Sequence, residues 1–218
     1  MVSRRGANSD GDDDLGGPPG RDELRAAALS YLARYASTQA ALARVLDKRI
    51  DTWARKAGSR YEIGELDRAT VAAAVTAAKA LAREVVAGMT QAGAVDDAAF
   101  AEMRASSLRR AGRSHRAVAA ALAAKGVDAE TARDVLENEA IGGQTAELTA
   151  AVRLARKRRI GPFRAGERPD PPGRMKELAI LARAGFAQPV ARWALDMERA
   201  EADNLLAAAP DPPTAAGG

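Results

Sequence analysis

The 218-residue chain contains no cysteine, one histidine and few aromatic residues, namely two Trp, three Tyr and three Phe. Without cysteine there is no disulfide, thiol nucleophile, iron–sulfur cluster or Cys-type zinc site. The chain also lacks a Walker A Gly-Lys-Ser/Thr sequence, an HExxH motif and the signature of a nucleophile elbow. A single histidine cannot build a His-rich metal site. The sequence therefore predicts a protein that is not an enzyme and that uses no metal or cofactor.

Long apolar runs are absent as well. The most apolar stretch, residues 71–80, is short and rich in alanine, whereas a membrane-spanning helix needs about 20 apolar residues. Arg4-Arg5 is not followed by an apolar segment, so it does not form a twin-arginine signal. Together with the missing cysteines, which fit a reducing compartment, this predicts a cytoplasmic protein without membrane contact.

The composition favours helices. Hydrophobic residues make up 47% of the chain, and much of that share is alanine, which promotes helix and adds little apolar area per residue. Few aromatic residues argue against a large β-sandwich. Apolar residues recur at helical spacing, for example Leu42, Leu46 and Ile50 in the second predicted helix and Val75, Ala78 and Val85 in the third. About nine helices and no strand are predicted, which makes the fold all-α.

Capping residues mark several helix ends. Ser37, Asp96, Ser114 and Asp128 are expected to be N-caps, and Gly126 is expected to be a glycine C-cap. The first helix is expected to run from Arg21 to Tyr35 with both Leu24 and Tyr35 on its inner face, and the last from 188 to 206, with Pro189 in its first turn.

An internal repeat organises the chain. Gly126-Val127-x4-Ala132-Arg133-x2-Leu136 matches Gly185-Phe186-x4-Ala191-Arg192-x2-Leu195 in residue class and spacing. We therefore predict three tandem three-helix units whose stacking buries a continuous face; an ordinary helical bundle with chance similarity is the alternative. The predicted segments are a disordered tail (1–20), repeat 1 (21–95), repeat 2 (96–142), repeat 3 (143–206) with a loop insertion (165–173), and a second disordered tail (207–218).

Two stretches break the charge balance. The chain has 33 Lys+Arg and 29 Asp+Glu, a net charge of +4, yet residues 103–127 and 151–164 hold no acid at all. Arginine dominates both stretches, and its planar guanidinium grips carboxylates or phosphates through two parallel hydrogen bonds. The candidate partner- or phosphate-binding residues are Arg104, Arg109, Arg110, Arg113, Arg116 and Lys125 in the first stretch and Arg153, Arg156, Lys157, Arg158 and Arg159 in the second.

A family resemblance joins these observations. The segments 96–101, 109–112 and 121–127 resemble the central repeat of the RecX family, the bacterial regulators of the RecA recombinase. Residues 29–37 resemble its opening helix and turn, and residues 158–164 and 181–186 resemble its third repeat, particularly in the alphaproteobacterial branch. The resemblance covers about residues 24–198. The first repeat departs from the pattern because it lacks a Lys-Gly ending, and the third because it carries the sequence AGERPDPPG.

The resemblance implies a monomer of three three-helix repeats in an elongated, curved, right-handed stack. It also implies binding to the RecA–DNA filament, with inhibition of its growth, strand exchange, ATPase and co-protease activities, and so a role in DNA repair, homologous recombination and the SOS response. Two other interpretations stay open. The same arginines are suited to single- or double-stranded DNA in a stand-alone DNA-binding protein, and a passive helical adaptor would leave them solvated.

Overall fold

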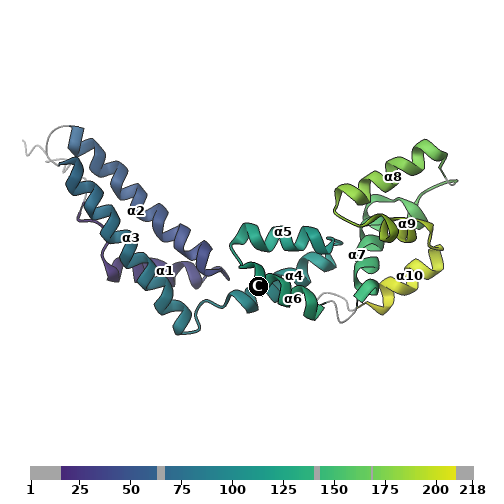
Figure 1. The fold of residues 1–218 in the computed structure, drawn as a ribbon, viewed down its shortest axis with the longest axis horizontal. Coiled ribbons are helices and arrows are strands. Elements are labelled where there is room, and N and C mark those ends of the chain that lie inside the picture. The colour runs from purple at the N-terminus through teal and green to yellow at the C-terminus, as the bar shows by residue number, and fades with distance from the viewer. Residues whose placement is uncertain (1–15, 63–66, 140–142, 168, 210–218) are drawn as a thin grey trace, which may run out of the picture. The chain divides into compact units, whose positions relative to one another are not determined.

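The computed structural model describes residues 16–62, 67–139, 143–167 and 169–209, without the side chains of 60–62, 138–139 and 143–144. Within these ranges the chain forms helices and no strand (Figure 1), so the predicted all-α class is confirmed. The elements are α1 (Arg21–Leu32), α2 (Gln39–Glu62), α3 (Arg68–Gln91), α4 (Asp97–Arg110), α5 (His115–Lys125), α6 (Ala129–Glu139), α7 (Gly143–Arg158), the 3-10 turn η2 (Gly161–Phe163), α8 (Pro171–Arg183), α9 (Gln188–Asp196) and α10 (Arg199–Ala208).

The chain divides into two compact units, residues 1–95 and 96–218. In the first unit α2 and α3 run side by side, and α1 packs against both (Figure 1). Leu24, Leu42, Leu46 and Ile50 are fully buried in its core, where they meet α3 through Ala78, Ala82, Val85, Val86 and Met89.

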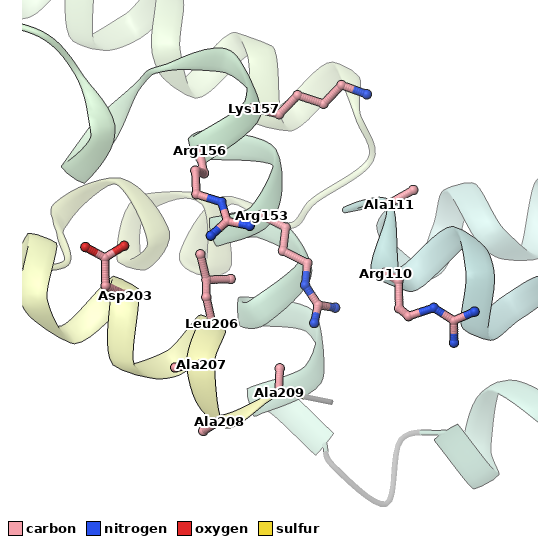
Figure 2. A pocket seen from close by; sticks show the side chains of 10 residues that line it. All are labelled: Arg110, Ala111, Arg153, Arg156, Lys157, Asp203, Leu206, Ala207, Ala208 and Ala209. Carbon is pink, nitrogen blue, oxygen red and sulfur yellow. The ribbon is translucent and has the colours of Figure 1, made fainter. Parts of the chain in front are cut away.

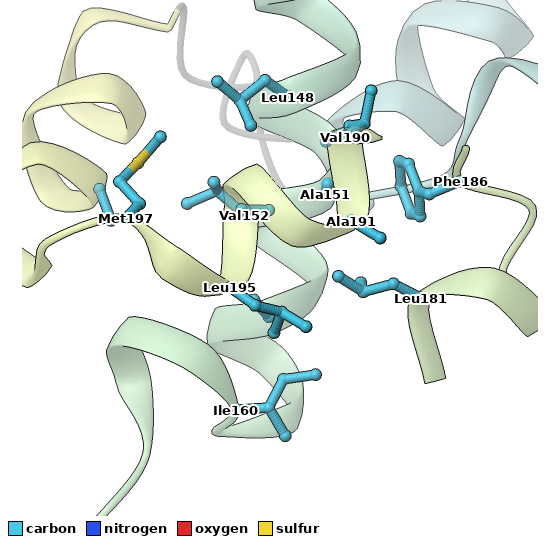
Figure 3. Close-up of a cluster of buried hydrophobic side chains, with 14 of the residues drawn as sticks. Leu148, Ala151, Val152, Ile160, Leu181, Phe186, Val190, Ala191, Leu195 and Met197 are labelled. Carbon is cyan, nitrogen blue, oxygen red and sulfur yellow. The ribbon is translucent and has the colours of Figure 1, made fainter. Parts of the chain in front are cut away.

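The second unit contains two apolar cores. Helices α4, α5 and α6 enclose the first, which includes Ala101, Ala105, Val118 and Leu122. Helices α7 to α10 and η2 enclose the second, which is larger (Figure 3). In that core Val152 from α7, Leu181 from α8 and Leu195 from α9 meet (Figure 3). Each core therefore belongs to one group of consecutive helices, as a helical repeat requires.

The internal repeat has a physical basis. Gly126 and Gly185 both adopt positive φ values, +85° and +92°, because each ends a helix in the left-handed conformation that glycine tolerates best. The apolar residue after each glycine and the later repeat positions are buried in both copies, namely Val127, Ala132 and Leu136 in one and Phe186, Ala191 and Leu195 in the other.

Most expected caps are found. The side chains of Asp96, Ser114 and Asp128 accept the amides of Ala99, Ala117 and Thr131. The cap of α2 differs, because Thr38 and not Ser37 accepts the amide of Ala41, at 3.1 Å. Both residues are buried, so composition alone does not separate the two neighbouring hydroxyls.

Two helix boundaries also differ from the sequence prediction. α1 ends at Leu32, so Tyr35 lies beyond it and is exposed. The predicted helix 188–206 is two helices, because Met197 leaves the helical conformation (φ −59°, ψ 143°) and its side chain is buried in the core. Burial of this methionine redirects the chain, and no glycine or proline marks the break in the sequence.

The predicted segment boundaries shift slightly. Residues 1–15 and 210–218 of the predicted tails lie outside the described residues, but in the first tail Pro19 is buried and the Gly16 carbonyl accepts the indole N–H of Trp53 at 3.4 Å. The predicted loop 165–173 already contains the start of α8, because Asp170 caps that helix by accepting the amide of Gly173. None of the described helices combines the length and the apolarity that crossing a membrane requires.

Candidate functional site

The two acid-free stretches of the sequence meet in space within the second unit. Arg110 and Ala111 at the end of α4 face Arg153, Arg156 and Lys157 on α7 across a cavity of about 780 Å³. The last turns of α10, from Asp203 to Ala209, complete its lining. Figure 2 shows Arg153 reaching from α7 toward the side on which Arg110 lies. Basic residues 43 positions apart in sequence thus line one cavity.

A second cavity, of about 390 Å³, adjoins the first and shares Ala111 and Lys157 with it. Its lining adds Arg113, Arg158 and Arg183 together with small or apolar residues of α7 and α8. We call the combined lining of the two cavities the basic groove. It contains seven basic residues, and Asp203 is the one acid that lines it.

The candidate residues fall into three groups. Those that line the basic groove are Arg110, Arg113, Arg153, Arg156, Lys157 and Arg158. Those that are exposed but outside its lining are Arg104, Arg116, Lys125 and Arg159. Arg109 alone is largely buried, with 13% of its side chain exposed, and its guanidinium forms an ion pair with Glu147.

Sequence reasoning missed Arg183. It lies in the last turn of α8. Residues 178–195 also lack acidic residues, but they hold only two cations, Arg183 and Arg192, and so do not form a basic cluster in the sequence. The position of Arg183 in the internal repeat could have indicated it. Gly185, at the end of α8, corresponds to Gly126, at the end of α5. Basic residues are frequent in the last turn before such an end, because they interact with the helix dipole.

Helix geometry explains how so many cations gather here. The C-cap residues of α4 and α8, Ala111 and Ala184, and the last turn of α7 all line the smaller cavity. Three helix C-termini therefore meet at the groove, each with the partial negative charge of its terminal carbonyl groups. These partial charges offset part of the repulsion among the cations that line the groove.

The groove presents mostly cationic side chains. Apart from its charged residues, its lining consists of Ala, Gly, Leu and Ile, so it offers no hydroxyl nucleophile or imidazole base. Asp203 is engaged by Arg199, whose Nε lies 2.9 Å from Oδ2. The arginines present several guanidinium groups to solvent, which is the arrangement that carboxylates and phosphates need.

Comparison with known proteins identifies the lineage. A regulatory protein RecX from Myxococcus xanthus is 38% identical over 173 residues, which make up 79% of this chain and 84% of the relative. The chain belongs to the RecX family. A regulatory protein RecX from Agrobacterium fabrum is 40% identical over 117 residues, 54% of this chain and 60% of the relative.

The family model described as RecX, second three-helix domain, matches residues 96–136. This segment comprises α4, α5 and most of α6, so the match coincides with the first core of the second unit. No solved structure matches the chain significantly. Relatives in this RecX family carry the name regulatory protein, which supports a regulatory role for this chain.

Proposed function

We propose that this RecX-family protein binds the RecA–DNA filament and restrains its recombinase, ATPase and co-protease activities. The proposal is supported by the relatives, which are named regulatory protein RecX, and by the basic groove, which offers a recognition surface for an anionic partner. The basic groove is the observation that carries the proposal, because six basic residues from α4, α7 and α8 and a seventh from the turn between α4 and α5 line it together with one acid.

In this account the groove binds acidic side chains exposed on filament subunits. Arg110, Arg113, Arg156 and Arg158 supply guanidinium groups that pair with carboxylates bidentately. Contacts to more than one subunit at once raise the effective affinity even when each contact is weak. The protein acts as a monomer, since a single chain already presents both acid-free stretches on one surface.

The test is RecA-dependent ATP hydrolysis on single-stranded DNA, with RecA from the same source and this protein added below stoichiometry. The proposal predicts strong inhibition and no ATP turnover by this protein alone. Unchanged hydrolysis up to equimolar protein would refute it.

Binding to DNA alone is the second candidate, because phosphates are recognised by the same arginines. It predicts tight binding to duplex DNA without RecA, with an affinity that falls with salt at a log–log slope of about −0.9 per neutralised phosphate. The two candidates separate in one experiment, in which inhibition is measured while competing duplex DNA is added. Filament binding predicts that the competitor has little effect, and DNA binding predicts that it abolishes inhibition.

A further inference from the structure

The two walls of the basic groove belong to different helical repeats, so the groove exists only while α4 and α5 are held against α7 and α8. We propose that Glu147 is a positioning residue that fixes this arrangement although it does not contact the partner. The inference rests on the function proposed above and adds to it the residue that keeps the recognition surface assembled.

Glu147 lies on α7 and connects to the neighbouring repeat at two points. One carboxylate oxygen, Oε2, forms an ion pair with Nη1 of Arg109 on α4. The backbone N–H of His115, the first residue of α5, donates to the same carboxylate at 3.1 Å to Oε2 and 3.3 Å to Oε1. The side chains of Arg109 and Glu147 are only 13% and 21% exposed, so solvent screens this pair less than a surface pair.

The carboxylate also complements the end of α5. The first N–H groups of a helix lack partners within the helix and carry a partial positive charge. Glu147 accepts one of them from outside the repeat, and Ser114 caps another, the amide of Ala117. α5 is therefore capped partly by a side chain of the next repeat, which ties its position to α7.

Arg109 takes part in the same arrangement. Besides pairing with Glu147, its Nη1 donates to the carbonyl of Arg113 at 3.1 Å. The guanidinium therefore braces the turn between α4 and α5, which carries Arg113 into the groove. This role differs from the partner contact expected from the sequence, because the charge of Arg109 is already used within the molecule.

Close backbone packing adds to these contacts between α4, α5, α7 and α8, which together we call the joint. The hydroxyl of Ser114 donates to the carbonyl of Ala184 at the end of α8, at 2.7 Å. A Cβ on Gly112 would lie 3.0 Å from the backbone nitrogen of Leu154 on α7. These approaches leave little room for the repeats to shift, so the guanidinium groups of both walls are held in place before the partner arrives. Such preorganisation lowers the entropic cost of binding.

A purely electrostatic role and a positioning role of Glu147 predict opposite effects of its substitution on partner binding. If only electrostatics mattered, Glu147→Ala would strengthen binding to an anionic partner, because it removes a negative charge and releases Arg109. If Glu147 positions the groove, the same substitution weakens binding. Glu102→Ala is the matched control, because it removes an equal charge from an exposed position on α4 that lies outside the groove lining and outside the joint.

The experiment measures the protein concentration that halves RecA-dependent ATP hydrolysis. We expect Glu147→Ala to raise it about tenfold, which corresponds to about 1.4 kcal/mol of binding free energy, and Glu102→Ala to leave it unchanged or lower it. Glu147→Gln retains the acceptor for the His115 amide, and we expect it to recover most of the inhibition. If Glu147→Ala inhibits as well as or better than the wild-type protein, the positioning role is refuted.

A spectroscopic measurement separates positioning from loss of folding. Because the chain has no cysteine, Ala124→Cys on α5 and Ala200→Cys on α10, both exposed, accept a pair of spin labels. We expect a narrow distance distribution that Glu147→Ala broadens while helix content by circular dichroism stays constant. An equally narrow distribution in the variant would overturn the inference. The wild-type assay reports on the proposed function separately: if the wild-type protein fails to inhibit, the proposed function is wrong, and the distance measurement still tests the joint.

Discussion

Gly185 gives the most sharply defined stability prediction, because two independent features of its site oppose a larger residue. Its φ is +92°, and a Cβ built on it would lie 2.6 Å from Oγ of Ser114. For a residue with a Cβ, the left-handed backbone costs about 1–2 kcal/mol. To relieve the clash, Ser114 must also move away from the Ala184 carbonyl, which costs about 1 kcal/mol for the hydrogen bond. We therefore expect Gly185→Ala to lower the free energy of unfolding by about 2–3 kcal/mol.

The measurement is urea denaturation of the full chain followed by circular dichroism. Gly166→Ala is the matched control, because Gly166 has a similar φ of +102° but no heavy atom within 4 Å of its Cβ position. It should cost only the backbone term, about 1–2 kcal/mol. Ser114→Ala removes the clashing oxygen, so in the double variant Gly185→Ala should cost no more than the control, which gives a coupling of about 1 kcal/mol between the two sites.

The reasoning fails if Gly185→Ala and Gly166→Ala destabilise the protein equally. It also fails if the effects of Ser114→Ala and Gly185→Ala are additive, because the clash would then not be the source of the extra cost.

Three further predictions concern repeat 3 and the start of α6. Arg159 has a φ of +55°, and among the described residues it is the one non-glycine with a positive φ. Arg159→Gly should therefore raise the free energy of unfolding by about 0.5–1 kcal/mol in urea denaturation, and unchanged or lower stability would contradict backbone strain at this position. Glu177 accepts hydrogen bonds from Nε and Nη2 of Arg164, and only 11% of its side chain is exposed. Glu177→Ala should lower the free energy of unfolding by about 3 kcal/mol in the same assay, because it leaves the partly buried charge of Arg164 without this partner. A loss below about 1 kcal/mol, which is typical of a surface pair, would show that the pair is not effectively buried. Hydrogen bonds from the hydroxyl and amide of Thr131 lower the pKa of Asp128 below its ordinary value. The stabilising effect of the Asp128 carboxylate is therefore fully present above the ordinary Asp pKa and is lost as the pH falls through the lowered pKa. The difference in free energy of unfolding between wild type and Asp128→Asn should shrink across that acidic range, and a constant difference would argue against a lowered pKa.

Local signals explain why much of the fold was predictable. Asp96, Ser114 and Asp128 cap helices by contacts that span three residues, and such contacts can be seen in the sequence. The repeated glycines mark helix ends because a left-handed residue is needed there. The break at Met197 was not predictable, since it depends on burial of that side chain in a core assembled from four helices.

The candidate site was predictable in part for the same reason. The missing acids are a property of the sequence, and they indicated which arginines gather. Their division into groove-lining, exposed and internally paired groups depends on tertiary contacts. The partner of Arg109 lies 38 residues away, and Arg183 enters the groove only because α8 ends beside α7.

Charge reversal within the groove tests the central claim most directly. Arg113→Glu with Arg158→Glu changes two exposed residues that line the smaller cavity. The matched control, Lys176→Glu with Arg192→Glu, changes the net charge equally at exposed positions outside the lining. In RecA-dependent ATP hydrolysis on single-stranded DNA, the account predicts that the groove pair loses inhibition and that the control pair retains it. Equal inhibition by the two double variants would contradict the assignment of the basic groove as the recognition surface.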